Sequence, residues 1–217
     1  MSITGDNNSI SDIKISSYNF TSASNTANAY GGAGFRVGAA YGSSSASASS
    51  VVTGLSLKNI IFYQNYTRAS SGDGGAISFV TNTTGSDQTA TINNCIFDGN
   101  TAGDYITPTV SSANNGGAIV LKDGNDITIN NSLFYDNRSM GFGGAITAGH
   151  YALGGTFPTL TIKNSLFYRN RWHSPSDANA GIYITDANLN LYNSFVNFNY
   201  YGDTSSVSDV GGNSAST

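Results

Sequence analysis

The feature that most constrains this chain is an internal repeat of about eleven residues that runs along its length. The clearest copies read ATINNCIFDGN, ITINNSLFYDN and LTIKNSLFYRN, and they begin at residues 90, 127 and 160. Related copies begin at Leu55 and Leu189, and a degenerate copy begins at Ile13. The first asparagine of the five good copies falls at 59, 94, 131, 164 and 193, so the period is loose. A loose period is typical of a solenoid with loops at its corners.

A second motif follows most copies. It reads GGAI at residues 74–77, 116–119 and 143–146, with variants GGAG at 31–34 and AGIY at 180–183. Short apolar stretches of period two alternate with Asn, Gly and Asp clusters, which indicates strands separated by turns. The repeat predicts an all-β, single-stranded parallel β-helix of about six coils, with a core ~29 Å long at ~4.8 Å per coil.

Composition supports this fold class. Only 10% of the residues are charged and all 13 acidic residues are Asp, so strong helix formers are scarce and a helical bundle is excluded. The net charge of −4 predicts no nucleic-acid partner, and the lack of an 18-residue apolar run predicts no direct membrane insertion. The expected organisation is a polar N-terminal segment (1–12), the β-helix (13–201) and a Ser/Gly-rich tail (202–217), with loops at 24–30, 38–53, 66–73, 101–115 and 149–158.

Stacking of coils predicts columns of like residues, and three apolar columns are expected to form the core. The first contains Phe20, Phe62, Phe97, Phe134, Phe167 and Val196. The second contains Ile61, Ile96, Leu133, Leu166 and Phe195. The third contains Ile15, Leu57, Ile92, Ile129, Ile162 and Leu191.

Two asparagine columns are expected to have structural roles, because amides can bond along a ladder and Asn tolerates left-handed corners. One column is Asn59, Asn94, Asn131, Asn164 and Asn193, and the other is Asn65, Asn100, Asn137, Asn170 and Asn199. The paired glycines are expected to allow positive φ and close backbone approach at a tight turn.

The pairing of GGAI with FxxN resembles the repeats of the chlamydial polymorphic outer membrane proteins. The FxxN matches are Phe62–Asn65, Phe97–Asn100, Phe134–Asn137 and Phe167–Asn170, and the resemblance covers residues 13–199. It implies a right-handed parallel β-helix that is secreted or displayed at a bacterial surface, often in adhesion. In that family the helix is the passenger of an autotransporter.

Many parallel β-helices act on polysaccharides, so a polysaccharide lyase or glycosidase is a candidate function. The candidate carboxylates are Asp73, Asp98, Asp104 and Asp136, but we expect Asp136 to form an exposed ion pair with Arg169. A lyase would need an acidic cluster beside the basic column of Arg138 and Arg171, and none accompanies it. His150 and His173 lack partners at ligand spacing, and Cys95 is alone. We therefore expect no enzyme, no cofactor and no metal.

Exposed aromatic residues are the candidate ligand or partner contacts, since they can stack on sugars or anchor a protein. They are Tyr63, Tyr135, Tyr168 and Trp172. A threonine column (Thr91, Thr128 and Thr161) is expected to be an ordinary solvated face. The favoured function is a non-catalytic, adhesin-like scaffold, extracellular or at the bacterial cell surface, whose partner is a host or cell-surface protein or a glycan. The alternatives are a fibre subunit that binds itself by head-to-tail β-stacking, and a polysaccharide lyase or glycosidase.

Overall fold

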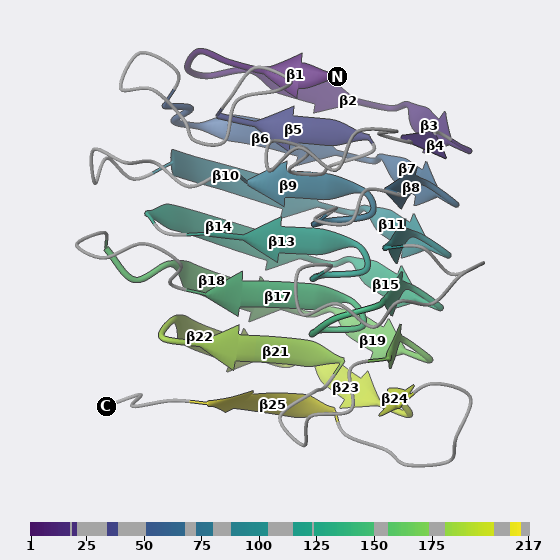
Figure 1. Ribbon diagram of the computed structural model, residues 1–217. Coiled ribbons are helices and arrows are strands. Elements are labelled where there is room, and N and C mark those ends of the chain that lie inside the picture. Colours follow the sequence, from purple (N-terminus) through teal and green to yellow (C-terminus); the bar gives the residue numbers. More distant parts are fainter. Residues whose placement is uncertain are drawn as a thin grey trace, which may run out of the picture.

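The chain winds into a parallel β-helix in the computed structural model (Figure 1). The structure describes residues 1–17, 19–20, 34–38, 51–67, 73–79, 88–103, 115–122, 124–149, 156–173, 181–201 and 209–213. Their strands form four sheets, here called A to D, and every strand pairing is parallel. No helix among these residues is long and apolar enough to cross a membrane.

Sheets A and B form one half of each coil. Sheet A contains β1 (Ser2–Ile3), β5 (Phe35–Val37), β9 (Ile77–Phe79), β13 (Ile119–Leu121), β17 (Ile146–Gly149), β21 (Ile182–Thr185) and β25 (Val210–Asn213). Sheet B contains β2 (Ser9–Ser11), β6 (Leu55–Lys58), β10 (Gln88–Asn93), β14 (Asn125–Asn130), β18 (Thr159–Lys163) and β22 (Asn188–Tyr192).

Sheets C and D form the other half, and their strands are shorter. Sheet C contains β3 (Lys14–Ser16), β7 (Ile61–Tyr63), β11 (Ile96–Asp98), β15 (Leu133–Tyr135), β19 (Leu166–Tyr168) and β23 (Phe195–Asn197). Sheet D contains β4 (Asn19–Phe20), β8 (Tyr66–Thr67), β12 (Thr101–Ala102), β16 (Arg138–Ser139), β20 (Arg171–Trp172) and β24 (Tyr200–Tyr201).

Each coil runs through sheets B, C, D and A in turn, and six such coils follow β1. The predicted fold class and coil number are therefore confirmed. Strands β1 and β2 lie within the segment expected to precede the helix, and β25 lies within the expected tail. Sheet D was not predicted, since β8 and β12 fall inside segments expected to be loops. The expected loop at 24–30 lies outside the described residues.

Two tight corners connect sheet B to C and sheet C to D in every coil. The first corner is made by the column of Asn59, Asn94, Asn131, Asn164 and Asn193, whose φ angles lie between 43° and 55°. The second has a variable left-handed residue, namely Gln64, Gly99, Asp136, Arg169 or Phe198. The predicted corner role of the first asparagine column is confirmed, since Asn adopts the left-handed region readily.

The core is a stack of phenylalanines flanked by a column of aliphatic residues. Adjacent rings of Phe62, Phe97, Phe134 and Phe167 lie 4.4–4.8 Å apart at interplanar angles of 5–6°. The third predicted column is equally buried at Leu57, Ile92, Ile129 and Ile162, but its last member, Leu191, is 38% exposed and not part of the core. Burying each of these large side chains contributes roughly 1.5–3 kcal/mol.

The register predicted for the first coil is wrong. Ile15 pairs with Phe62 rather than with Leu57, and Phe20 pairs with Thr67 rather than with Phe62. Ile10 takes the place expected for Ile15, opposite Leu57. The physical reason lies in the corners: Asp12 and Ser17 have φ of 58° and 56°, so they replace the usual corner residues and fix the register.

The second asparagine column is a buried hydrogen-bonded ladder, as predicted. The Asn100 backbone N–H and Nδ2 both donate to Oδ1 of Asn137, at 3.0 and 2.9 Å. The same pair of bonds joins Asn65 to Asn100, Asn137 to Asn170 and Asn170 to Asn199. Each Nδ2 also donates to a main-chain carbonyl of the preceding coil, as Asn137 does to Phe97 at 2.9 Å. All the polar atoms of an inner rung are thereby satisfied without water.

Asp209 closes this ladder at its C-terminal rung. Its Oδ1 accepts from the Asn199 backbone N–H and Nδ2 at 3.2 and 3.1 Å, which is the bonding that another asparagine would provide. Asp209 immediately precedes β25, in the column that holds Ala76, Ala118 and Ala145 in earlier coils. Its Oδ1 thus takes the acceptor position that the side-chain oxygen of the next asparagine provides in the inner rungs.

Replacing Asp209 with alanine is expected to lower the free energy of unfolding by about 1–3 kcal/mol, because two donors of Asn199 lose their acceptor. Urea unfolding followed by far-UV circular dichroism measures the effect. Asp209→Asn, which keeps an acceptor oxygen, is the matched control and should lose well under half as much. Equal losses in the two variants would show that Asp209 does not stabilise the fold through this oxygen.

Candidate binding face on sheet C

The second predicted apolar column lies outside the β-helix, which corrects the expectation that it belongs to the core. Ile61, Ile96, Leu166 and Phe195 are between 37 and 59% exposed, whereas the phenylalanine beside each of the first three is fully buried. Successive side chains of a strand point to opposite faces, so Phe62 inside requires Ile61 and Tyr63 outside. The outer surface of sheet C therefore presents an apolar ladder along the helix axis.

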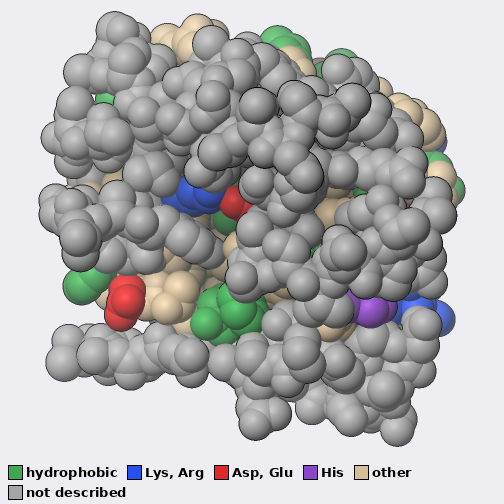
Figure 2. Space-filling model, viewed as in Figure 1, with side chains coloured by type: hydrophobic (Ala, Val, Ile, Leu, Met, Phe, Trp, Pro, Cys, Tyr) green, Lys and Arg blue, Asp and Glu red, His purple; other side chains and the backbone are tan. Residues whose placement is uncertain are grey.

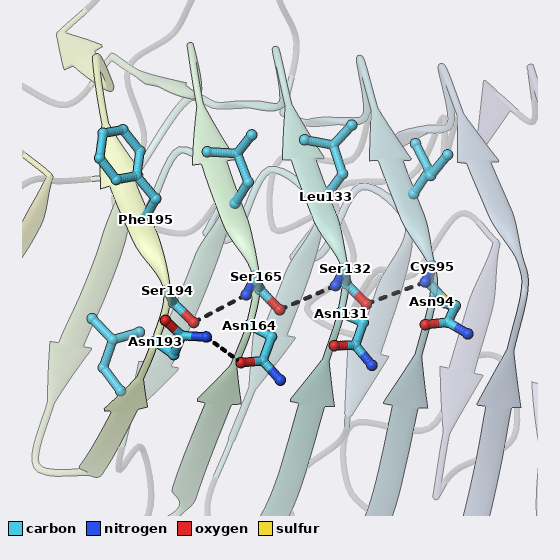
Figure 3. Close-up of a pocket in the computed structure, with 13 residues that line it drawn as sticks. Asn94, Cys95, Asn131, Ser132, Leu133, Asn164, Ser165, Asn193, Ser194 and Phe195 are labelled. Carbon is cyan, nitrogen blue, oxygen red and sulfur yellow. Dashed lines mark hydrogen bonds between the residues drawn. The ribbon is translucent and has the colours of Figure 1, made fainter.

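An open groove of about 900 Å³ runs along this ladder at the corner between sheets B and C (Figure 3). One side carries the corner amides, with Leu191 of β22 at the C-terminal end, and the other side carries the outward apolar side chains. The floor between them is a column of small residues, namely Cys95, Ser132, Ser165 and Ser194. The same three-residue unit of amide, small residue and apolar side chain thus recurs in four successive coils.

The serine floor is satisfied internally. Ser132 Oγ accepts from the Cys95 backbone N–H at 3.2 Å, and Ser165 Oγ accepts from the Ser132 N–H at 3.1 Å. Each serine hydroxyl also donates to a carbonyl two residues earlier, as Ser165 does to Lys163 at 2.8 Å. The polar groups that the groove presents outward are therefore the corner amides. Of these, Asn193 Nδ2 donates to Asn164 Oδ1 at 2.7 Å.

The predicted tyrosine contacts lie on the same face, two positions beyond the apolar ladder. Tyr63, Tyr135 and Tyr168 are half-buried and share one column with Asp98 between the first two. The rings of Tyr135 and Tyr168 stack at 6.0 Å, and the ammonium of Lys14 lies 4.5 Å from the centre of the Tyr63 ring. Contact of these tyrosines with a ligand stays a prediction.

Trp172 does not share this surface. It lies on β20 of sheet D and is only 3% exposed, so its ring is not available to stack on a ligand. The column that it occupies points inward, with Thr67, Ala102 and Ser139 at the equivalent positions. In β8, β12, β16 and β20 the second of the two residues points inward, which places Trp172 in the interior. Strands this short leave little periodic pattern in the sequence.

The candidate carboxylates are engaged in separate contacts. Asp136 binds Arg171 at 3.0 Å rather than the predicted Arg169, whose guanidinium hydrogen-bonds Tyr200 instead. Asp73 forms a buried ion pair with Lys122 at 2.8 Å beside sheet A, the side of the molecule seen in Figure 2. Asp104 and His150 lie outside the described residues. Among the residues that the structure places, no three His, Cys, Asp or Glu side chains converge to hold a metal.

Asp98 is an acidic interruption of the tyrosine column. Partial burial raises the pKa of its carboxyl group, the charge of Asp136 raises it further, and Lys14 opposes both effects. A carboxyl whose pKa is higher in the folded than in the unfolded state stabilises the fold only when protonated, and this contribution is lost as the pH rises through the folded pKa.

Asp98→Asn is therefore expected to be more stable than the wild type at pH 7, with the difference vanishing at pH values below the ordinary range of an Asp carboxyl. Thermal unfolding of both proteins across the acidic range up to pH 7 measures this difference. A gain in stability that persisted unchanged at the acid end would mean that the substitution acts through packing and not through the charge.

The outer face of sheet B differs from that of sheet C. Thr91, Thr128 and Thr161 pair along it as predicted, with Ser56 and Asn190 at its ends. A neighbouring outward column holds Thr89, Asp126, Thr159 and Asn188. This polar face has the same strand geometry as sheet C and lacks its apolar ladder, so it provides matched control positions.

Comparison with known proteins supports the sequence resemblance. Residues 94–122 match the Chlamydia polymorphic membrane protein (Chlamydia_PMP) repeat. The matched segment runs from the corner residue Asn94 through β11, β12 and β13, and it includes one FxxN and one GGAI motif. No curated protein matches the chain, and no solved structure matches it. The chain is thus a parallel β-helix that contains a repeat of this type.

Proposed function

We propose that the protein is a non-catalytic, adhesin-like scaffold that acts at a cell surface. The observation that carries the proposal is the ordered apolar ladder on the outer face of sheet C, exposed along several coils. Contiguous exposed apolar surface is typical of interaction sites, whereas scattered apolar residues are not. The match to a polymorphic membrane protein repeat supports a surface location.

The architecture suits presentation of such a face. In the second to sixth coils the path from sheet B through C to D is fully described and contains only two-residue corners, so this part of the chain places no loop on the sheet C face. The buried asparagine ladder and the stacked phenylalanines hold successive coils in register. A ligand would therefore meet a rigid, periodic surface that needs little reorganisation on binding.

Binding of the fluorescently labelled chain to cultured epithelial cells tests the proposal. We expect saturable binding that excess unlabelled protein displaces. Binding that is absent, or that rises linearly without saturation, would contradict an adhesin-like function. A chain unfolded by a core substitution, such as Phe134→Asp, controls for non-specific adsorption.

The fibre alternative meets a geometric obstacle in sheet A. If β2 of a second copy paired with β22 of the first, β1 of the second copy would fall between β21 of the first copy and β5 of the second. That position is already filled by β25 of the first copy, which pairs with β21. A continuous stack thus requires β1 or β25 to leave its sheet. We expect electron micrographs of the intact chain to show dispersed short rods at all concentrations. Filaments would instead support the alternative of a fibre subunit.

A further inference from the structure

The groove between sheets B and C has a regular lining that restricts what it can bind. Its four repeating units follow one another at the coil spacing of about 4.8 Å, so the groove is a strip ~19 Å long. That strip is far smaller than the ~800 Å² per partner of a standard protein–protein interface. The shape fits a single extended chain lying along the helix axis.

The chemistry of the lining restricts the ligand further. Among the residues that the structure describes, no charged side chain lines the groove. On one side, Asn94, Asn131, Asn164 and Asn193 offer amides, each with donors and acceptors. The opposite side offers aliphatic and aromatic surface at Ile96, Leu133, Leu166 and Phe195. A charged polymer would find no counter-charge there and would lose hydration.

We propose that the groove binds a neutral, extended polysaccharide of 1,4-linked hexoses; this inference rests on the proposed binding function. A sugar ring presents apolar C–H faces and a rim of hydroxyl groups, which match the two sides of the groove. An extended 1,4-linked chain advances by about one coil height per sugar, so each ring can meet one asparagine and one apolar residue. A β-strand advances only ~3.3 Å per residue, so a peptide lying along the axis falls out of step with the coils.

Affinity electrophoresis through gels that contain soluble polysaccharide tests the inference. Hydroxyethyl cellulose and glucomannan are the neutral 1,4-linked probes, while polygalacturonate and dextran test charge and linkage. We expect the neutral 1,4-linked polymers to retard the native chain and the other two to leave its mobility unchanged. Retardation by polygalacturonate to the same extent would overturn the assignment of a neutral ligand.

A pair of matched variants locates the site. Leu133→Asp places a charge in the groove, whereas Thr128→Asp places the same charge on the outer face of sheet B. We expect the first to weaken retardation at least about tenfold and the second to change it less than about twofold. Urea unfolding confirms that both variants are folded. Equal retardation of the two variants would overturn the placement of the ligand in this groove.

The outcomes separate this inference from the proposed function. If the chain binds cells saturably but no neutral polysaccharide retards it, the glycan assignment is wrong and the binding function stands. Loss of cell binding after trypsin treatment of the cells would then identify a protein partner. If the chain binds neither cells nor polysaccharides, both proposals fail.

Discussion

Gly117→Ala is expected to lower the free energy of unfolding by about 3 kcal/mol or more, enough to unfold a marginally stable chain at 25 °C. A Cβ at this position would lie 2.1 Å from the carbonyl oxygen of Gly144 and 2.6 Å from two backbone atoms of Arg138. Both residues belong to the next coil, Arg138 at the start of β16 and Gly144 just before β17, so their backbone atoms cannot yield without separating the coils. The measurement is urea unfolding, with solubility on expression as a first indication.

Gly99→Ala is the matched control for this prediction. Gly99 has φ of +65°, but a Cβ there meets only the flexible Cγ of Gln64 at 3.3 Å. The cost of a left-handed alanine is about 1–2 kcal/mol, and no backbone clash adds to it. If the two variants lost equal stability, the close approach of successive coils would not be what requires glycine at residue 117.

Asn137→Ala is expected to cost about 3–5 kcal/mol, the second large effect. The side-chain amide accepts two bonds from Asn100 and donates to Asn170 and to the Phe97 carbonyl, all at 2.9–3.0 Å. Alanine would remove these four buried bonds, take away the acceptor of the Asn100 backbone N–H, and add a small cavity. Urea denaturation gives the change in stability, provided that the slope of the unfolding free energy against urea concentration is the same for both proteins.

Asn131→Gly is the corresponding control in the other asparagine column. Asn131 is exposed and has φ of 49°, a conformation that glycine adopts without strain. We expect a change within about 0.5 kcal/mol. Comparable losses in Asn131→Gly and Asn137→Ala would contradict the assignment of a backbone role to the corner asparagines and a hydrogen-bonding role to the ladder asparagines.

Much of the fold could be predicted from the sequence, because the repeat fixes which residues stack. The parallel β-helix, the phenylalanine stack and both asparagine columns follow from alignment of the copies. The prediction that Ile61, Ile96 and Leu133 belong to the core is wrong, although the sequence contains a signal for their outward position. Neighbouring residues of a strand cannot both face the core, so the buried phenylalanine forces the residue before it outward.

Other features left too weak a trace in the sequence. Strands of sheet D have two residues each, which is too short for a period of two to identify an inward position such as that of Trp172. The first coil departs from the motif, and its register depends on left-handed Asp12 and Ser17, which the repeat does not mark. The partner of Asp136 could not be predicted either, because Arg169 and Arg171 lie close together in sequence and only the structure selects Arg171.

The claim that the outer face of sheet C is the binding surface is tested most directly by comparing cell binding of Leu133→Asp and Thr128→Asp, measured with labelled protein in flow cytometry. The two positions lie on adjacent faces of the same coil, and both variants carry one added charge. If the sheet C face is the binding surface, Leu133→Asp loses at least about tenfold in affinity while Thr128→Asp stays within about twofold of the wild type. Equal binding by the two folded variants would contradict that claim.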